Sequence, residues 1–311
     1  MTLRPTLPQQ QGALAANLIC MASMLVWAAA LPAADVLIGP VPPIPLTAAR
    51  MALAALVLLP LWVLLEGPGV LRGAGWIKGI VIGGGTIGFG ATMLVMGQAR
   101  TSAVTVAVIS ATMPVIGIAI EVLLDGRRLT PGLVIGVLLS LAGGVMALGN
   151  GGGTQGLALG IGALLAFGSV ITFTFGSRWT VTAFPDLSPM GRTTVTLTGA
   201  ALATALATLL HHLSGGATPD WAVLGWKEFG ALIIFAVGGL AISQVLWIIS
   251  VGSLGIGLAS LHINLTPFYV MLVVFALGGR WDWLQAIGAA VVGIGVLIAQ
   301  GIIPIRPARR A

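Results

Sequence analysis

The sequence predicts an all-α integral membrane protein that crosses the bilayer ten times. Apolar residues make up 58% of the 311 residues, whereas Asp, Glu, Lys and Arg together make up 7%. A typical soluble domain contains roughly 25% charged residues, so this chain cannot form a surface suited to water. The chain also contains ten apolar runs of about the 20 residues that a membrane-spanning helix needs. The composition therefore excludes soluble enzymes and nucleic-acid-binding proteins, and the lipid bilayer is the expected surrounding.

The ten apolar runs follow one another through short connections and leave no room for a separate soluble domain. They cover residues 14–34, 44–65, 77–97, 101–123, 131–149, 156–177, 189–210, 227–250, 254–276 and 283–303. A transmembrane β-barrel would instead show segments of about 10 residues with alternating hydrophobicity. The first run follows Arg4 and ends near Ala28–Ala30, as a secretory signal does, but it exceeds the usual apolar core of about 7–15 residues. We therefore expect it to remain as the first helix.

Basic residues predict the orientation of the chain, because cytoplasmic loops carry an excess of Lys and Arg. With the N-terminus in the cytoplasm, nine basic residues lie inside: Arg4, Arg72, Lys78, Arg127, Arg128, Arg178, Arg306, Arg309 and Arg310. Three then lie outside: Arg100, Lys227 and Arg280. The sequence therefore predicts that both termini are cytoplasmic.

The two halves of the chain repeat each other. Equivalent positions lie 152 or 153 residues apart: Arg128 and Arg280, Gly136 and Gly288, Gly143 and Gly295, Pro114 and Pro267. The sequence thus predicts two five-helix halves, residues 12–149 and 156–303, joined by the glycine-rich run 149–153. Because five is odd, the second half enters the membrane from the opposite side, and such inverted repeats are typical of transporters that alternate between two open states. The alternative is a duplication retained only for stability.

The segment after the fourth run reads Asp125-Gly126-Arg127-Arg128-Leu129, followed by Thr130-Pro131-Gly132 and Gly136. With the ten-helix layout, this pattern resembles the drug/metabolite transporter superfamily with paired EamA domains, over residues 12–303. That family often carries Leu-Gly-Glu-Arg-Leu after its fourth and ninth helices. Here the glutamate is missing from both copies, because the second reads Leu277-Gly278-Gly279-Arg280-Trp281. Within the superfamily, the chain is most similar to the YddG-type exporters of aromatic amino acids, which implies a bacterial inner-membrane location.

Polar and aromatic residues at mid-depth are the candidates for substrate binding, because lipid-facing positions disfavour polar groups. They are Trp27, Thr86, Phe89, Ser110, Phe173, Ser243, Gln244, Trp247, His262 and Asn264. Ser243 and Trp247 lie four residues apart, so they share one helix face. An apolar pocket with a few amides and hydroxyls suits a neutral or zwitterionic, partly aromatic solute. The alternative for each residue is helix packing or an interfacial aromatic belt.

Two prolines and two arginines have separate interpretations. Pro114 and Pro267 occupy equivalent places near the middle of a run, where proline bends a helix, so we expect a pair of gating helices. A static bend is the alternative. Arg50 and Arg192 lie early in the second helix of each half, from which either side chain can reach the membrane interface. For Arg50, a contact with a substrate carboxylate is the second interpretation.

Other functions would require clusters of catalytic or charged residues that this sequence does not contain. A membrane-embedded acyl or glycosyl transferase would need a cluster of Asp, Glu or His, yet only Asp220 and Glu228 accompany His211 and His212. The paired histidines lack the spacing of a zinc site. A transporter of phosphorylated sugars would need several inward-facing Lys or Arg residues, and the middle of the third, fourth, eighth and ninth runs has none. We expect no cofactor and no metal, and a monomer that binds a small-molecule substrate.

The coupling of transport is the remaining question. A proton-coupled drug antiporter needs a titratable carboxylate near mid-membrane. The acidic residues lie in connections or at helix starts, apart from Glu121, which lies about two residues or 3 Å from the end of the fourth run. His262 is the titratable side chain well inside a central run, where a packing role is the alternative to a proton site. The sequence therefore predicts uniport-type movement of a neutral solute, with proton-coupled antiport as the alternative.

Overall fold

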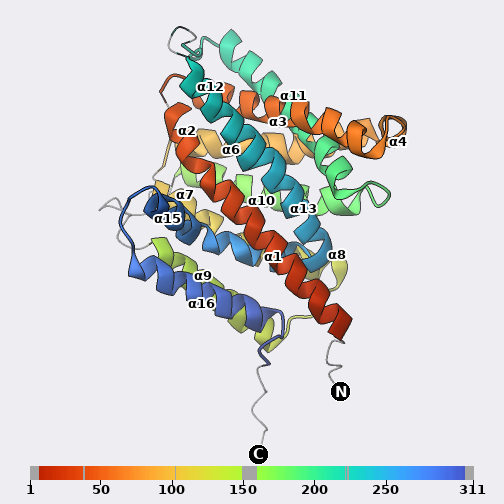
Figure 1. Cartoon of the computed structure of the whole chain (residues 1–311), viewed down its shortest axis with the longest axis vertical. Coiled ribbons are helices and arrows are strands. Elements are labelled where there is room, and N and C mark those ends of the chain that lie inside the picture. Colours follow the sequence, from red (N-terminus) through yellow and green to blue (C-terminus); the bar gives the residue numbers. More distant parts are fainter. Residues whose placement is uncertain are drawn as a thin grey trace, which may run out of the picture.

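The chain is described by a computed structural model over residues 7–37, 39–101, 103–148, 160–220, 222 and 224–304, in which all regular structure is helical (Figure 1). The first half contains α1 (Leu7–Ala29), α2 (Leu31–Leu37), α3 (Pro43–Glu66), α4 (Val70–Gly73), α5 (Trp76–Ile82), η1 (Gly83–Gly88), α6 (Phe89–Gln98), α7 (Ala103–Ser110), α8 (Met113–Asp125) and α9 (Pro131–Leu148). The second half contains α10 (Ile161–Thr182), α11 (Pro189–Leu213), α12 (Trp226–Ile233), η4 (Ile234–Ile242), α13 (Ser243–Leu254), α14 (Ile256–Ser260), η5 (Leu261–Leu265), α15 (Thr266–Ala276) and α16 (Trp283–Ala299).

Eight helical segments in the described residues are long and apolar enough to cross a membrane. They are Gly12–Ala34, Pro43–Glu66, Trp76–Gln98, Val108–Asp125, Ile161–Thr182, Pro189–Leu213, Trp226–Leu254 and Ile256–Ala276. Two shorter apolar helices, Pro131–Met146 and Trp283–Ala299, coincide with the remaining two apolar runs. The prediction of an all-helical, multi-pass membrane protein is confirmed. The predicted connection 149–153 and the start of the sixth run lie outside the described residues.

Five of the runs that the sequence predicts as continuous helices are interrupted. The first run is divided into α1 and α2, and the third and eighth contain the π-helical segments η1 and η4. The fourth run is divided into α7 and α8, and the ninth contains the 3₁₀ segment η5 between α14 and α15. The third and eighth runs therefore each contain a π-helical segment, and the fourth and ninth are each interrupted before a proline.

Proline explains the breaks in the fourth and ninth runs. Pro114 and Pro267 each lie in the first turn of a new helix, α8 and α15. Proline has no backbone N–H, so it fits the first turn, where that donor has no partner inside the helix. A helix therefore begins at each of these two prolines, whereas a bend there and a role in gating stay predictions.

Glycines let helices that are far apart in the sequence approach closely. A Cβ atom added to Gly136 of α9 would lie 2.4 Å from the carbonyl oxygen of Gly295 in α16. One added to Gly143 would lie 2.5 Å from the carbonyl oxygen of Gly288. Because the earlier glycine of α9 meets the later glycine of α16, the two helices pack antiparallel. Figure 1 shows them side by side, and the four glycines are the repeat positions of the sequence.

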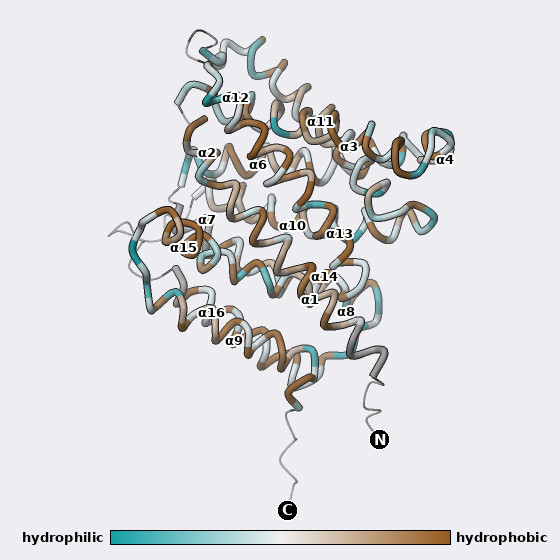
Figure 2. The backbone as a smooth tube through the Cα atoms, viewed as in Figure 1, coloured by the Kyte–Doolittle hydropathy of each residue, from teal (hydrophilic) through white to brown (hydrophobic). Residues whose placement is uncertain are grey.

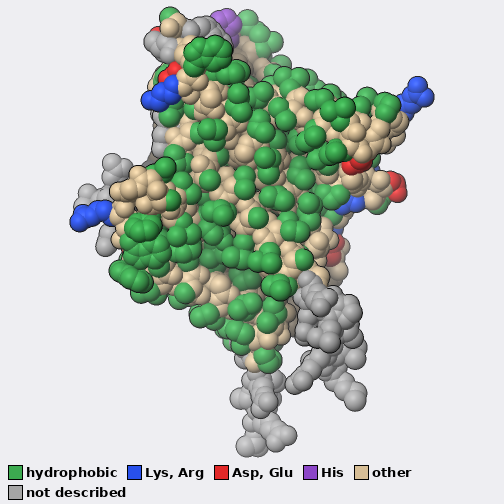
Figure 3. All heavy atoms as spheres, in the orientation of Figure 1, with side chains coloured by type: hydrophobic (Ala, Val, Ile, Leu, Met, Phe, Trp, Pro, Cys, Tyr) green, Lys and Arg blue, Asp and Glu red, His purple; other side chains and the backbone are tan. Residues whose placement is uncertain are grey.

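Polar contacts between connections lie at two ends of the molecule. At one end, Lys78 donates to the carbonyl oxygen of Ala183 at 2.6 Å, and Arg178 pairs with Asp125. At the other end, the backbone N–H of Asp220 donates to the carbonyl oxygen of Pro40 at 3.0 Å. Between them, helices that are mostly hydrophobic cross the molecule (Figure 2), and the visible surface is largely apolar with charged side chains near its edges (Figure 3). This distribution is the one that a bilayer requires.

Candidate functional site

The best-formed group of candidate residues lies between α10 and α13. The rings of Phe173 and Trp247 stack with their centroids 6.3 Å apart and an interplanar angle of 22°. Trp247 is 2% exposed, and its indole Nε1 donates to Ser177 Oγ at 3.0 Å. Ser177 follows Phe173 by four residues, so both side chains lie on one face of α10. The structure thus joins two predicted residues and adds Ser177.

Gln244 lies on α13, one turn before Trp247. Its side chain is 6% exposed, and its amide Nε2 has no hydrogen-bond partner within the described part of the chain. A buried donor without a partner costs about 1–3 kcal/mol, so such a group in a native protein calls for water or a ligand. The acceptor that would satisfy it is a carboxylate or carbonyl oxygen.

Ser243 and Arg50 both donate to one backbone carbonyl oxygen, that of Gly239. The Ser243 hydroxyl donates to the carbonyl oxygen of Gly239 at 2.8 Å, and Arg50 Nη2 donates to the same oxygen at 3.3 Å. The Arg50 guanidinium also lies 4.0 Å from the centre of the Phe235 ring. Ser243 is tied to α1 as well, because its carbonyl oxygen accepts from Ser23 Oγ at 2.7 Å.

The contacts of Arg50 bear on its two interpretations, a side chain at the membrane interface or a contact with a substrate carboxylate. Its side chain contacts η4 through the Gly239 carbonyl oxygen and the Phe235 ring, and both interpretations stay predictions. Its Nε is buried without a partner among the described residues. Arg192, in contrast, donates to the carbonyl oxygens of Phe184 and Pro185 in the connection before its helix.

His262 and Asn264 lie apart from this group, in η5. Asn264 Nδ2 donates to the hydroxyl of Ser140 at 3.0 Å and to its carbonyl oxygen at 3.2 Å, which ties η5 to α9. His262 is 2% exposed, and its Nδ1 lies 3.2 Å from the carbonyl oxygen of Ala259. Ser140, which the sequence analysis missed, is the polar residue of α9 opposite Asn264; nothing in its apolar sequence context indicated a partner.

The other predicted site residues are not gathered with Trp247. The buried Thr86 packs against Gly176, where an added Cβ would lie 2.3 Å from its hydroxyl oxygen. Trp27 and Ser110 are half-buried. Phe89 is 54% exposed, so it is not buried with Trp247, and its role in the site stays a prediction. It directly follows η1, and one extra residue in a helix rotates everything after it by about 100°.

The acidic residues near the membrane-spanning segments are engaged. Glu121 is buried at the end of α8, pairs with Arg127 and accepts the backbone N–H of Gly257 at 2.9 Å. It therefore links α8 to the first turn of α14 and is not a free carboxylate. The described residues include no group of His, Cys, Asp and Glu that could hold a metal ion. His211 and His212 lie in the last turn of α11.

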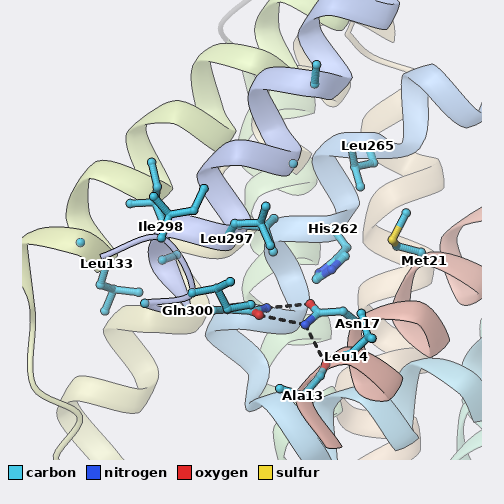
Figure 4. Close-up of a pocket in the computed structure, with 18 of the residues that line it drawn as sticks. Ala13, Leu14, Asn17, Met21, Leu133, His262, Leu265, Leu297, Ile298 and Gln300 are labelled. Atoms are coloured by element: carbon cyan, nitrogen blue, oxygen red, sulfur yellow. Dashed lines mark hydrogen bonds between the residues drawn. The ribbon is translucent and has the colours of Figure 1, made fainter. Parts of the chain in front are cut away.

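A separate cleft of about 1820 Å³ opens between α1, α15, α16 and the start of α9. Figure 4 shows Asn17 and Gln300 bonded across its polar end, with His262 behind them. Of the predicted site residues, only His262 lines this cleft; Gln244 and Trp247 do not.

Comparison with known proteins agrees with this architecture. Residues 14–149 match the model of the EamA-like transporter family. The chain is 28% identical over 270 residues to YyaM of Bacillus subtilis (strain 168), an uncharacterized transporter, covering 82% of this chain and 84% of YyaM. A solved crystal structure superimposes with a TM-score of 0.76 at 22% identity, covering 93% of this chain and 97% of its own, which is a likeness of fold alone. Residues 14–149 therefore match an EamA-like transporter domain, and the comparisons indicate a transporter rather than an enzyme.

Proposed function

We propose that this transporter exports neutral amino acids, aromatic ones above all, and that the α10–α13 group contacts the substrate. The observation that carries the proposal is the buried, unpartnered Nε2 of Gln244 one turn from the Trp247–Phe173 stack. The indole and phenyl faces suit an aromatic side chain, and the amide suits a carboxylate. Arg50 contributes a positive charge at the neighbouring Gly239 carbonyl, beside Ser243, with a second unpartnered donor at its Nε. The resemblance of the sequence to the YddG-type exporters of aromatic amino acids supports the same substrate class.

The mechanism that we propose is alternating access between two inverted five-helix halves, residues 12–149 and 156–303. Three features support it. The interruptions η1 and η4 occupy equivalent places, as do the breaks before Pro114 and Pro267. The fifth and tenth apolar helices pack antiparallel through equivalent glycines. Inverted repeats open toward either side of the membrane by rocking one half against the other around a fixed site.

We place both termini in the cytoplasm of a bacterial cell, with the chain in its inner membrane. The bias of basic residues supports this orientation. The contacts at the two ends of the molecule agree with alternating crossings, because Lys78, Ala183, Asp125 and Arg178 fall on one predicted side and Pro40 and Asp220 on the other.

Transport is proposed to be uniport. The Glu121 carboxylate is occupied by contacts with Arg127 and the Gly257 N–H, which supports a transport step that does not use it. Substrate-loaded proteoliposomes should show efflux with no imposed pH gradient. Strict dependence on a proton gradient, abolished by His262→Ala, would instead establish the proton-coupled antiporter.

The test of the substrate site uses proteoliposomes loaded with radiolabelled tryptophan or phenylalanine. Gln244→Ala should reduce efflux at least tenfold, because a bond to a charged ligand group contributes about 1.5–3 kcal/mol. Gln98→Ala is the matched control, since it makes the same change at an exposed position at the end of α6. Wild-type efflux by Gln244→Ala and also by Trp247→Ala would move the site away from α13. Absence of efflux by the wild type for a full panel of amino acids would reject the substrate class.

A further inference from the structure

The cleft beside α1 has the shape and polarity of a site for an amphiphile. Its volume of about 1820 Å³ exceeds the roughly 300–1,000 Å³ of pockets for small solutes. At one end lie Arg128 and Thr130, together with Asn17 and Gln300. Farther along, the lining is apolar and includes Leu265, Phe268 and Ala289. A polar end and a long apolar remainder match a molecule with a headgroup and a chain.

The polar end presents one uncompensated positive charge. Arg127 lies in the same lining but pairs with the buried Glu121, so its charge is offset. Arg128 is exposed, and the structure gives it no ion pair among the described residues. Thr130 caps the next helix, since its hydroxyl accepts from the backbone N–H of Leu133 at 3.2 Å. Arg128 thus stands just before the start of α9, an 18-residue helix whose N-terminal end also favours an anion.

Two further observations point to an occupant of the cleft. The hydroxyl of Tyr269 lines it and is buried without a partner in the described part of the chain. Gly293 of α16 also lines it, and a Cβ added there would meet nothing within 4 Å. The amides of Asn17 and Gln300, in contrast, satisfy each other through reciprocal bonds of 2.8 and 2.7 Å (Figure 4). Among the described residues, the cleft therefore contains a cation without an ion pair at its mouth, a phenol hydroxyl without a partner, and unfilled space beside Gly293.

We propose that this cleft binds an anionic phospholipid of the adjoining leaflet, with its phosphate at Arg128 and the first turn of α9 and an acyl chain along Phe268 and Gly293. Basic pockets between transmembrane helices hold anionic headgroups in this way. The site is distinct from the proposed substrate contacts, because Gln244, Trp247 and Phe173 do not line the cleft. It does not depend on which solute is transported.

Native mass spectrometry of the detergent-purified protein, titrated with phosphatidylglycerol or phosphatidylcholine, tests this. The wild type should retain phosphatidylglycerol preferentially. Arg128→Gln should weaken that retention about fivefold, since one basic residue near anionic lipid contributes about 1 kcal/mol. Arg72→Gln is the matched control, because Arg72 is an exposed arginine of α4 outside the cleft, and it should retain lipid as the wild type does.

A second variant tests the chain part of the cleft. Gly293→Phe fills open space in the lining and should lower phosphatidylglycerol retention with little loss of thermal stability. Equal retention by the wild type, Arg128→Gln and Gly293→Phe would overturn the proposal, as would equal retention of phosphatidylcholine. Normal lipid retention by Gly293→Phe with efflux abolished would also overturn it, because the cleft would then be the substrate route.

Discussion

The close approach of α9 and α16 predicts a large penalty for one methyl group. In Gly136→Ala, the new Cβ would lie 2.4 Å from the carbonyl oxygen of Gly295 and 2.6 Å from both the backbone N and the Cβ of Ala299. Atoms at these separations overlap, and two of the three belong to the backbone of α16, so the helices must separate. Overpacking of this kind costs about 1–3 kcal/mol.

The control separates this clash from the intrinsic effect of alanine. Replacing glycine with alanine inside a helix is favourable by roughly 0.5–1 kcal/mol when nothing obstructs the methyl group. Gly293→Ala in α16 meets that condition, because its Cβ has no neighbour within 4 Å. The free energies of unfolding of the two variants should therefore differ by about 1.5–4 kcal/mol.

Thermal unfolding in detergent, followed by tryptophan fluorescence, measures the difference. One kcal/mol shifts Tm by roughly 2–4 °C in proteins of about 150–250 residues, so Gly136→Ala should melt about 3–16 °C below Gly293→Ala. Gly295→Ala should behave like Gly136→Ala, because its Cβ would lie 2.6 Å from the carbonyl oxygen of Gly136. Equal melting temperatures for all three variants would show that α9 and α16 are not in contact at these glycines.

Three further predictions concern charge and topology. Glu121→Gln should lower the free energy of unfolding by about 1–3 kcal/mol, because it breaks a buried ion pair. Asp125→Asn, at the more exposed pair with Arg178, should lower it by less than about 1 kcal/mol. Equal melting temperatures of these two variants would contradict the burial of Glu121. Arg50→Lys should impair efflux, because a lysine retains the charge but not the planar guanidinium that contacts both Gly239 and Phe235. Efflux at the wild-type rate would show that this contact has no role in transport. Reporter fusions should read as cytoplasmic at Arg128 and external at Ala217, and the reverse result would invert the proposed topology.

The sequence predicts the membrane-spanning segments well because each is a continuous apolar run, a property that does not depend on neighbours. It does not predict the irregular turns inside those runs. The backbone at Gly83, for example, lies so close to Thr196 of α11 that an added Cβ would be 1.8 Å from its carbonyl oxygen. Whether η1 forms is therefore decided by packing against a helix more than a hundred residues away in the sequence. After such a segment, the regular spacing of an α-helix no longer predicts which side chains share a face.

For the candidate site too, the sequence predicts features within one helix but not contacts between helices. Spacing along one helix predicts that Ser243 and Trp247 share a face, because residues four apart do so. The stack on Phe173 and the bond to Ser177 depend on how α10 lies against α13, which no local pattern encodes. Arg50 is the clearest case, since its partner Gly239 is 189 residues away and offers only a backbone carbonyl.

The two halves also differ in the contacts of their corresponding arginines, and the inverted-repeat proposal requires the halves to have unlike conformations. Arg50 and Arg192 occupy similar places in the second helix of each half, yet Arg50 contacts the π-helical segment η4 while Arg192 binds carbonyl oxygens of a connection. A transporter with inverted halves is open to one side only while the halves have unlike conformations. In the proposed mechanism, the half that contains η4 supplies the buried amide and the carbonyl that holds the guanidinium. The substrate carboxylate would then lie between the Gln244 amide of the second half and the Arg50 guanidinium of the first, and the aromatic stack of α10 and α13 would stay with the second half through the exchange.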